Sequence, residues 1–479
     1  MAQLAACLGA LGAVLVLVPR RREATLAGLI LVGVAIVLLE TTGRGHISHS
    51  RAALEVAALP LAAVVAAVFV RRPALVPPAV LLAAPFRLPL SFGSSHRFYV
   101  GLAHGGEVGR LLPLYGIVAA AALALAWKLL RGGNQPVIVR EISVPVSAFV
   151  AFDSMSYLWT DSTSAARNLL AFFVLPFVVL VAVVARSPFA AWLPRVLASL
   201  AIGLACLFAG IGLIEEATRR LLFYTPPVEV GNAYSSFFRV TSLFRDPSLY
   251  GRHVVLGISV VLVLTWFRRL RLLVGALLIG LLFAGLFYSY SQSSFAALFA
   301  VGLFVVAIAG DRPVRVLATA VTVVILAAGT AYAADKIATS STQRVTSDRS
   351  RRVELTVRVF VHHPIVGVGI GSQPLATQAI SVDGGPPNLF VSHTTPLTVA
   401  AELGVIGLAL YAFLLAGVGR ALDRIRRSDA TFGLALAAVF VALFVHALFY
   451  AGFFEDPLTW LVLGVAGSFL AARAAETAS

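Results

Sequence analysis

The sequence predicts an all-α, polytopic transmembrane helical bundle of about 12–15 helices, with a large extracytoplasmic loop that contains short surface helices. Of the 479 residues, 59% are hydrophobic and only 12% are charged, whereas soluble domains carry about 25% charged residues. The mean hydropathy is +0.93. Apolar runs of about 18 residues or more recur along the whole chain, each long enough to cross the hydrocarbon core. The runs are continuous and not alternating, so they predict helices.

The basic residues indicate how these helices are oriented. The net charge is +15, and the arginines gather in short clusters between apolar runs, for example at residues 20–22, 268–271 and 420–427. Short basic loops stay in the cytoplasm, so the clusters predict membrane topology, and we expect no nucleic-acid partner. With the clusters inside, two long segments, residues 215–250 and 334–395, fall outside. They hold most of the polar residues that topology does not explain.

Three details of the apolar runs carry further expectations. The first run, residues 4–18, is followed by arginines and not preceded by charge, which predicts a retained helix and not a cleaved signal peptide. The fourth run, residues 74–88, contains two prolines and is expected to be broken or re-entrant. Cys7 and Cys206 lie inside apolar runs, so we expect packing residues and no disulfide or cysteine metal site.

The first outside segment carries three arginines near a predicted point of membrane entry. Arg239, Arg245 and Arg252 surround the pair Asp246-Pro247. A guanidinium group offers a planar fork of donors that suits phosphate oxygens. In the alternative interpretation, Asp246 pairs with Arg245, Pro247 starts a helix, and the arginines contact lipid headgroups. The spacing alone leaves both interpretations open.

The second outside segment combines a basic helix with glycines. Residues 348–360, which include Arg352, predict a short amphipathic helix on the outer surface. His363-Pro364 follows, and then glycines at every second position from 367 to 371. Such glycines let backbone approach backbone or a ligand closely. They follow no α/β strand, so the context excludes a dinucleotide fold.

A third group lies where that segment enters the next helix. A lone histidine such as His393 at a loop-to-helix junction is more often structural than catalytic, yet a neutral imidazole there could act as a general base on a sugar hydroxyl. Glu402 falls about two and a half helical turns further on. We expect it inside the bilayer, where an ionisable side chain usually faces a partner or a cavity.

These segments, in this order, resemble the O-antigen ligase and polymerase family. The resemblance covers roughly residue 231 to the C-terminus. The matching residues are Arg239, Phe244 and Pro247; His363-Pro364 with Gly367 and Gly369; His393 ahead of Glu402, Gly404 and Gly407; and Asp456-Pro457 with Trp460.

The chain also departs from the family pattern. Ser242 replaces a glycine, and Asp246, Ser248 and Thr394 replace asparagines. The family commonly has Ser-Arg-Gly at an outer turn, where the arginine is thought to bind the diphosphate; here Ser294 stands in its place. Either another arginine, such as Arg252 or one of residues 349–352, takes that role, or the donor is held differently.

The resemblance implies an inverting, metal-independent glycosyltransferase without cofactors, in the bacterial cytoplasmic (inner) membrane, with its active site on the extracytoplasmic side. The donor would be a polyprenyl-diphosphate-linked glycan, the acceptor another glycan or a lipid, and membrane lipids would surround the protein. His393 would deprotonate the acceptor, and Arg239 would neutralise the leaving diphosphate. Asp348 and Asp383 alone are too few for a metal site. The expected diphosphate- and glycan-binding residues are Arg245, Arg252, Arg352, His363, Ser294 and Glu402.

On this interpretation residues 1–214 are N-terminal transmembrane helices, and residues 215–479, with both outer loops, form the catalytic region. The sequence does not separate a ligase, which moves a finished chain to a different acceptor, from a polymerase, which joins repeat units. A glycan or lipid flippase would need ionisable residues inside helices, and Asp153 and Glu402 are the clear candidates. A non-catalytic scaffold would tolerate substitution of His393 and Arg239.

Overall fold

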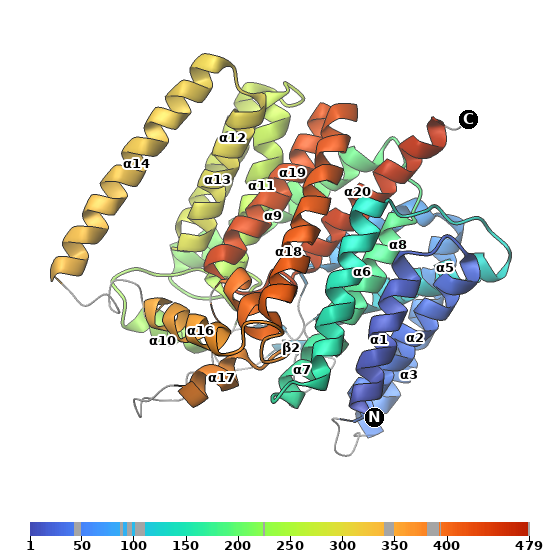
Figure 1. Ribbon diagram of the computed structural model, residues 1–479. Coiled ribbons are helices and arrows are strands. Elements are labelled where there is room, and N and C mark those ends of the chain that lie inside the picture. The colour runs from blue at the N-terminus through green and yellow to red at the C-terminus, as the bar shows by residue number, and fades with distance from the viewer. Residues whose placement is uncertain are drawn as a thin grey trace.

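The structure is a computed structural model, and it describes residues 1–42, 49–86, 90–92, 98–100, 111–223, 226–339, 349–380, 392 and 394–477. Long helices run side by side through the molecule (Figure 1). They are α1 (Ala2–Leu17), α2 (Arg22–Thr41), α3 (His49–Arg71), α5 (Leu112–Leu130), α6 (Arg140–Met155), α8 (Leu175–Ala185), α9 (Leu193–Thr218), α11 (Pro247–Trp266), α12 (Leu272–Phe287), α13 (Gln292–Ala309), α14 (Arg312–Thr339), α18 (Thr395–Ser428), α19 (Ala430–Phe449) and α20 (Pro457–Glu476).

Shorter elements connect or cover the long helices. They are η1 (Pro73–Leu75), α4 (Val76–Ala83), η3 (Ser156–Leu158), α7 (Thr163–Leu169), η4 (Leu170–Val174), α10 (Pro226–Ala233), α16 (Arg349–His362), α17 (Gln373–Ile380) and the antiparallel strands β1 (Leu90–Phe92) and β2 (Phe98–Val100). Among the described residues, nine helices are long and apolar enough to cross a membrane, one of them formed by α7, η4 and α8 together. The prediction of an all-α polytopic bundle is confirmed.

The break expected in the fourth run lies before the helix and not within it. The chain turns by 116° between α3 and the segment Pro73–Ala83. Pro77 and Pro78 lie in the first turn of α4, where a missing N–H removes no helical hydrogen bond. The helix ends at Ala83, earlier than the predicted residue 88.

Two helices from distant parts of the chain form the centre of the bundle. Every residue of α8 is buried, as are the residues of α20 from Pro457 to Leu470. A Cβ added at Gly464 would stand 2.7 Å from Val184, and one at Gly467 would stand 2.9 Å from Ala185. Small residues let membrane helices approach this closely. The predicted regions 1–214 and 215–479 therefore share one core.

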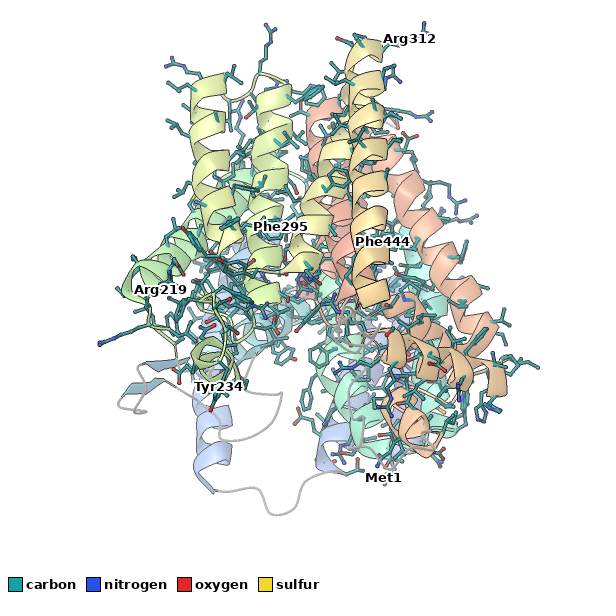
Figure 2. The ribbon with its side chains drawn as sticks, turned by 90° about the vertical axis from the view of Figure 1, so that its left-hand side faces the viewer. Met1, Arg219, Tyr234, Phe295, Arg312 and Phe444 are labelled. Carbon is teal, nitrogen blue, oxygen red and sulfur yellow. The ribbon has the colours of Figure 1, made fainter. Side chains whose placement is uncertain are left out.

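The two ends of the bundle differ in their polar groups. One end, here called the polar end, carries α10, α16, α17 and the β1–β2 hairpin (Figure 1). The opposite, arginine-rich end carries the turns at residues 268–271 and 426–429. Figure 2 shows the same division, with Arg312 at one end and Met1 and Tyr234 at the other.

Helix α16 is the amphipathic surface helix that the sequence predicts. Its buried face holds Leu355, Thr356 and Val359, and Val357 and Val361 on the other side are exposed. It packs on α17 and α18. It therefore lies across the polar end and covers the ends of transmembrane helices.

Candidate active site

The glycine-rich segment after α16 docks into a break in α18. Gly404 has φ +64° and ψ −161°, which interrupts the helix. In an unbroken helix, the carbonyls of Ala401 and Glu402 would accept from the amides of Val405 and Ile406. Here they accept from two amides of the glycine-rich segment, at 3.0 and 2.8 Å, while the freed amides donate to carbonyls of the same segment, at 2.8 and 3.4 Å. The segment thus satisfies the backbone groups that the break exposes.

The close approach of these backbones explains the two glycine motifs together. Gly367 has φ +68°, and a Cβ there would collide with the backbone of Glu402. A Cβ at Gly404 would collide with the backbone of Ile365. The sequence left open whether these glycines let the backbone approach another backbone or a ligand, and in the described residues they let backbone approach backbone.

The break places Glu402 in a small cavity with two other acids. The cavity is about 70 Å³ and is lined by Asp153 of α6, by Glu402, by Glu455 before α20, and by Thr395 and Thr398. Asp153 and Glu402 are only 7% and 8% exposed. Burial raises the pKa of Glu455 above its ordinary value. Because buried like charges repel, the three carboxyls cannot all ionise without cost. In the described part of the chain, no three His, Cys, Asp or Glu side chains are grouped to hold a metal ion.

Arg239 is fixed in the loop between α10 and α11. Its backbone amide donates to Asn232 Oδ1 at 2.9 Å, and Asn232 Nδ2 donates to its carbonyl at 3.0 Å. Its side chain is half-buried, and Nε donates to Ser289 O at 3.2 Å. This bond uses one of the five guanidinium donors. Burial lowers the pKa of Arg239 below its ordinary value, the charge of Asp246 raises it, and the charge of Arg349 lowers it further.

A buried carboxylate shapes the loop that carries Arg239. Glu215 of α9 is fully buried, and its Oε2 accepts from the amides of Thr241 and Ser242 at 2.9 and 2.8 Å. Ser242 has φ +50°, a conformation that favours glycine. This geometry accounts for the glycine that the family has at that position. Glu215 was not among the predicted site residues, although an acid at the end of an apolar run is a usable signal.

The turn before α13 is filled by serine hydroxyls. Ser294 is fully buried, and its Oγ lies 2.8 Å from Ser291 Oγ and 3.4 Å from Ser248 O. A Cβ at Gly251 would stand 2.6 Å from Ser294 Oγ, so the glycine at 251 leaves the space that the Ser294 hydroxyl occupies. Ser294, expected to bind substrate, contacts protein groups in the structure.

Arg349, from α16, reaches the turn where the family has an arginine and this chain has Ser294. Its Nη1 donates to Gln292 Oε1 at 3.1 Å, across 57 residues of sequence. Arg239 donates to Ser289 O and Arg349 to Gln292 Oε1, so guanidinium groups from two different elements bond residues at the same turn. The sequence offered residues 349–352 as one replacement for the family's arginine, and the structure brings the first of them to the turn.

The other proposed replacement, Arg252, has a different partner. Arg252 is 3% exposed, and its Nη2 lies 2.7 Å from Oδ2 of Asp456, which is 1% exposed. Asp456 also caps α20 through Leu458 N, at 2.8 Å. This buried ion pair ties α11 to α20.

Asp246 and His446 complete the polar network below the arginines. Asp246 caps α11 and accepts from Tyr450 OH at 2.9 Å, and Pro247 begins that helix. His446 is fully buried, with Nε2 at 3.1 Å from both Ser293 Oγ and Ser248 O. Sequence analysis did not select His446, although an ionisable residue inside an apolar run signals such a role.

The remaining predicted residues lie around these groups. Arg245 is exposed, Arg352 is half-buried on α16, and His363 is exposed just after α16 ends. His393 lies outside the described residues. The chain on either side of it is held in place, because Ser392 N donates to Gln373 Oε1 at 3.0 Å and Thr394 precedes α18.

Together these features define a polytopic membrane protein with arginines and buried carboxyls at one end of a helical bundle. Residues 277–412 match the family model described as O-antigen ligase, so the similarity to that family is found in this part of the chain. The match is narrower than the resemblance from residue 231 onward: it includes the turn before α13, α16 and Glu402, but not Arg239 or Asp456. No curated protein matches the chain.

Proposed function

We propose that this protein is a membrane glycosyltransferase that transfers or polymerises a polyprenyl-diphosphate-linked glycan. The reaction would take place on the outer face of the bacterial cytoplasmic membrane, with inversion and without a metal. The observation that carries the proposal is that Arg239 and Arg349, from different elements, both bond residues at the turn where α13 begins, inside the segment that matches the O-antigen ligase family model.

The two arginines suit a diphosphate leaving group. They come from separate elements, and Asp246, the nearby carboxylate, is already engaged by the amides of Ser248 and Leu249 and by Tyr450. Guanidinium groups aimed at phosphate oxygens stabilise the charge that develops as the diphosphate departs. Arg245, which is exposed beside this group, would add to the positive field. Arg252 is committed to Asp456, so we assign it a positioning role.

The acceptor would approach from the other side, near the start of α18. His393 would take the proton of an acceptor hydroxyl, whose oxygen then bonds to the anomeric carbon of the donor. The bond from that carbon to the phosphate oxygen breaks, and the diphosphate leaves with the electron pair. Attack opposite the leaving group inverts the anomeric configuration. Arg352 and His363, at the two ends of α16, would contact the glycans. Glu402 is buried and accepts from Gln373 N at 3.3 Å, so it would position the segment that follows α16.

One observation favours a different function. Asp153, Glu402 and Glu455 surround one small cavity, and buried acids within membrane helices are also typical of proton-coupled transporters. A flippase for lipid-linked glycan is therefore the second candidate. Its carboxyls would be essential for movement of glycolipid, and Arg239 and His393 would not be needed for bond formation.

The experiment that tests the proposal is glycan transfer by the purified protein in nanodiscs. Polyprenyl-diphosphate oligosaccharides from the native strain are supplied with EDTA, and wild type is compared with Arg239→Ala and His393→Ala. Lengthened donor identifies a polymerase, and glycan on a second acceptor identifies a ligase. We expect product from wild type and a large loss in both variants. Equal activity in all three proteins would refute both residue roles.

A further inference from the structure

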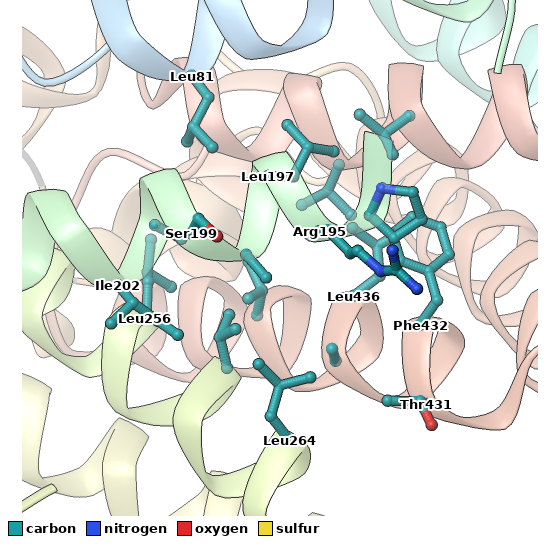
Figure 3. Close-up of a pocket in the computed structure, with 18 of the residues that line it drawn as sticks. Leu81, Arg195, Leu197, Ser199, Ile202, Leu256, Leu264, Thr431, Phe432 and Leu436 are labelled. Carbon is teal, nitrogen blue, oxygen red and sulfur yellow. The ribbon is translucent and has the colours of Figure 1, made fainter. Parts of the chain in front are cut away.

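A large apolar cavity lies in the half of the bundle opposite the polar end. It measures about 750 Å³, within the range of about 300–1,000 Å³ that ligand sites in proteins have. Helices α4, α9, α11, α19 and α20 line it and leave it partly open, and its walls are mostly aliphatic, as Figure 3 shows for Leu81, Leu197, Ile202, Leu256 and Leu264. None of the groups that we assign to glycan transfer lines it.

The cavity is long and runs parallel to the helices. On α11 it extends from Leu256 to Leu264, about 12 Å at the helical rise of about 1.5 Å per residue. Its inner end lies at Leu256 and Leu458, just beyond the buried pair Arg252–Asp456. This ion pair separates the cavity from the polar end. An extended hydrocarbon chain fits such a shape.

The charged lining of the cavity is confined to its other end. Arg195 and Arg269, both exposed, line it there together with Asp429. The carboxylate of Asp429 caps α19 by accepting from Phe432 N at 2.9 Å. Figure 3 shows Arg195, Thr431 and Phe432 among the residues that line the cavity. With two arginines and one carboxylate that already accepts a hydrogen bond, this end of the cavity carries a net positive charge.

The backbone holds both arginines at the rim. Arg268 has φ +55° and ends α11 with a tight turn, in which the amides of Arg269 and Leu270 both donate to Leu264 O, at 2.8 and 3.2 Å. Arg195 lies in the first turn of α9, which has no side-chain cap. The partial positive charge of a helix N-terminus adds to the attraction for an anion.

We propose that this cavity binds one anionic phospholipid from the leaflet at the arginine-rich end. Its phosphate lies between Arg195 and Arg269, and one acyl chain follows the aliphatic wall toward Leu256. Guanidinium groups favour phosphate oxygens, and the walls offer an acyl chain a protein surface in place of other lipid chains. The polyprenyl donor is a poorer fit, because its diphosphate belongs at Arg239 and Arg349, at the other end. The inference goes beyond glycan transfer and rests on the proposed function only where it excludes the donor lipid from the cavity.

Native mass spectrometry of the purified full-length protein tests the proposal. The probes are palmitoyl-oleoyl phosphatidylglycerol and the phosphatidylcholine with the same chains, titrated separately. We expect wild type to retain one phosphatidylglycerol at least about ten-fold more tightly than phosphatidylcholine. The double variant Arg195→Gln, Arg269→Gln loses this preference. Arg271→Gln is the matched control, because Arg271 is exposed on the same turn but does not line the cavity.

A second variant tests the apolar part of the site. Ala435→Phe, on α19, fills the cavity from its wall and should abolish retention of phosphatidylglycerol in protein that remains monodisperse. Equal retention of the two lipids by wild type would overturn the proposal, as would unchanged retention in the double variant or in Ala435→Phe. Displacement of phosphatidylglycerol by a polyprenyl phosphate would overturn it too, because the cavity would then belong to the donor lipid.

Discussion

Arg349 offers a sharp test of how the diphosphate is held. Its guanidinium bonds Gln292, three residues from the Ser289 carbonyl that Arg239 bonds, so Arg349→Ala removes a cation from the proposed site without disturbing the core. A hydrogen bond to a charged group contributes about 1.5–3 kcal/mol. If Arg349 makes one such bond to the leaving group, kcat/KM falls about 10- to 150-fold, at about 1.4 kcal/mol per ten-fold.

Arg358 supplies the matched control. It lies on the same helix and pairs with Glu354 at 2.6 Å, with both side chains more than half exposed. Such a surface pair contributes about 0–1 kcal/mol, so Arg358→Ala should leave kcat/KM within about two-fold of wild type. The assay is initial rate of glycan transfer in nanodiscs against donor concentration. A rate for Arg349→Ala within two-fold of wild type, or an equal loss in Arg358→Ala, would refute the assignment.

Three further predictions concern the scaffold. Gly404→Ala should lower the melting temperature of the detergent-solubilised protein markedly, because φ at this position is +64° and the added Cβ meets the backbone of Ile365. The control Gly419→Ala has open space around its Cβ and should leave the melting temperature unchanged, so equal melting temperatures for the two variants would argue against the docked segment. Arg252→Ala leaves the carboxylate of Asp456 buried without its cation and should lower the free energy of unfolding by about 3–5 kcal/mol, measured as loss of folded protein on heating. A small change in stability would mean that the ion pair is dispensable. Burial raises the pKa of Glu455 in the folded protein, so its contribution to stability is present at low pH and is lost as pH rises through the folded pKa. Glu455→Gln should therefore make the melting temperature depend less on pH. An unchanged dependence of melting temperature on pH would contradict this.

Local patterns in the sequence were enough to predict the helices. Hydropathy predicts the spans. The apolar residues of α16 predict a surface helix but not its buried face, because Val353 and Val357 are exposed and Thr356 is buried. The glycine motifs were identified as places of close approach, but not as partners of each other. Gly367 and Gly404 are far apart in sequence, and no local pattern records that one segment docks on the break in the other.

The candidate site depends mainly on long-range pairs of this kind. Arg349 meets the turn before α13 across 57 residues, and Asp153 joins Glu402 from a different half of the chain. Glu215 and His446 act on loops and helix ends that become neighbours only when the bundle forms. The residue types were enough to predict what chemistry each position could supply. Which arginine, Arg252 or Arg349, reaches the turn where the family has its arginine could be learned only from the fold.

Transfer in oriented liposomes tests the central claim most directly. Polyprenyl-diphosphate glycan and acceptor are added outside vesicles that hold the protein in a known orientation, with EDTA on both sides. We predict a new glycosidic bond only when the polar end faces the added substrates. Transfer from the arginine-rich side, or movement of glycolipid across the bilayer without any product, would contradict the account.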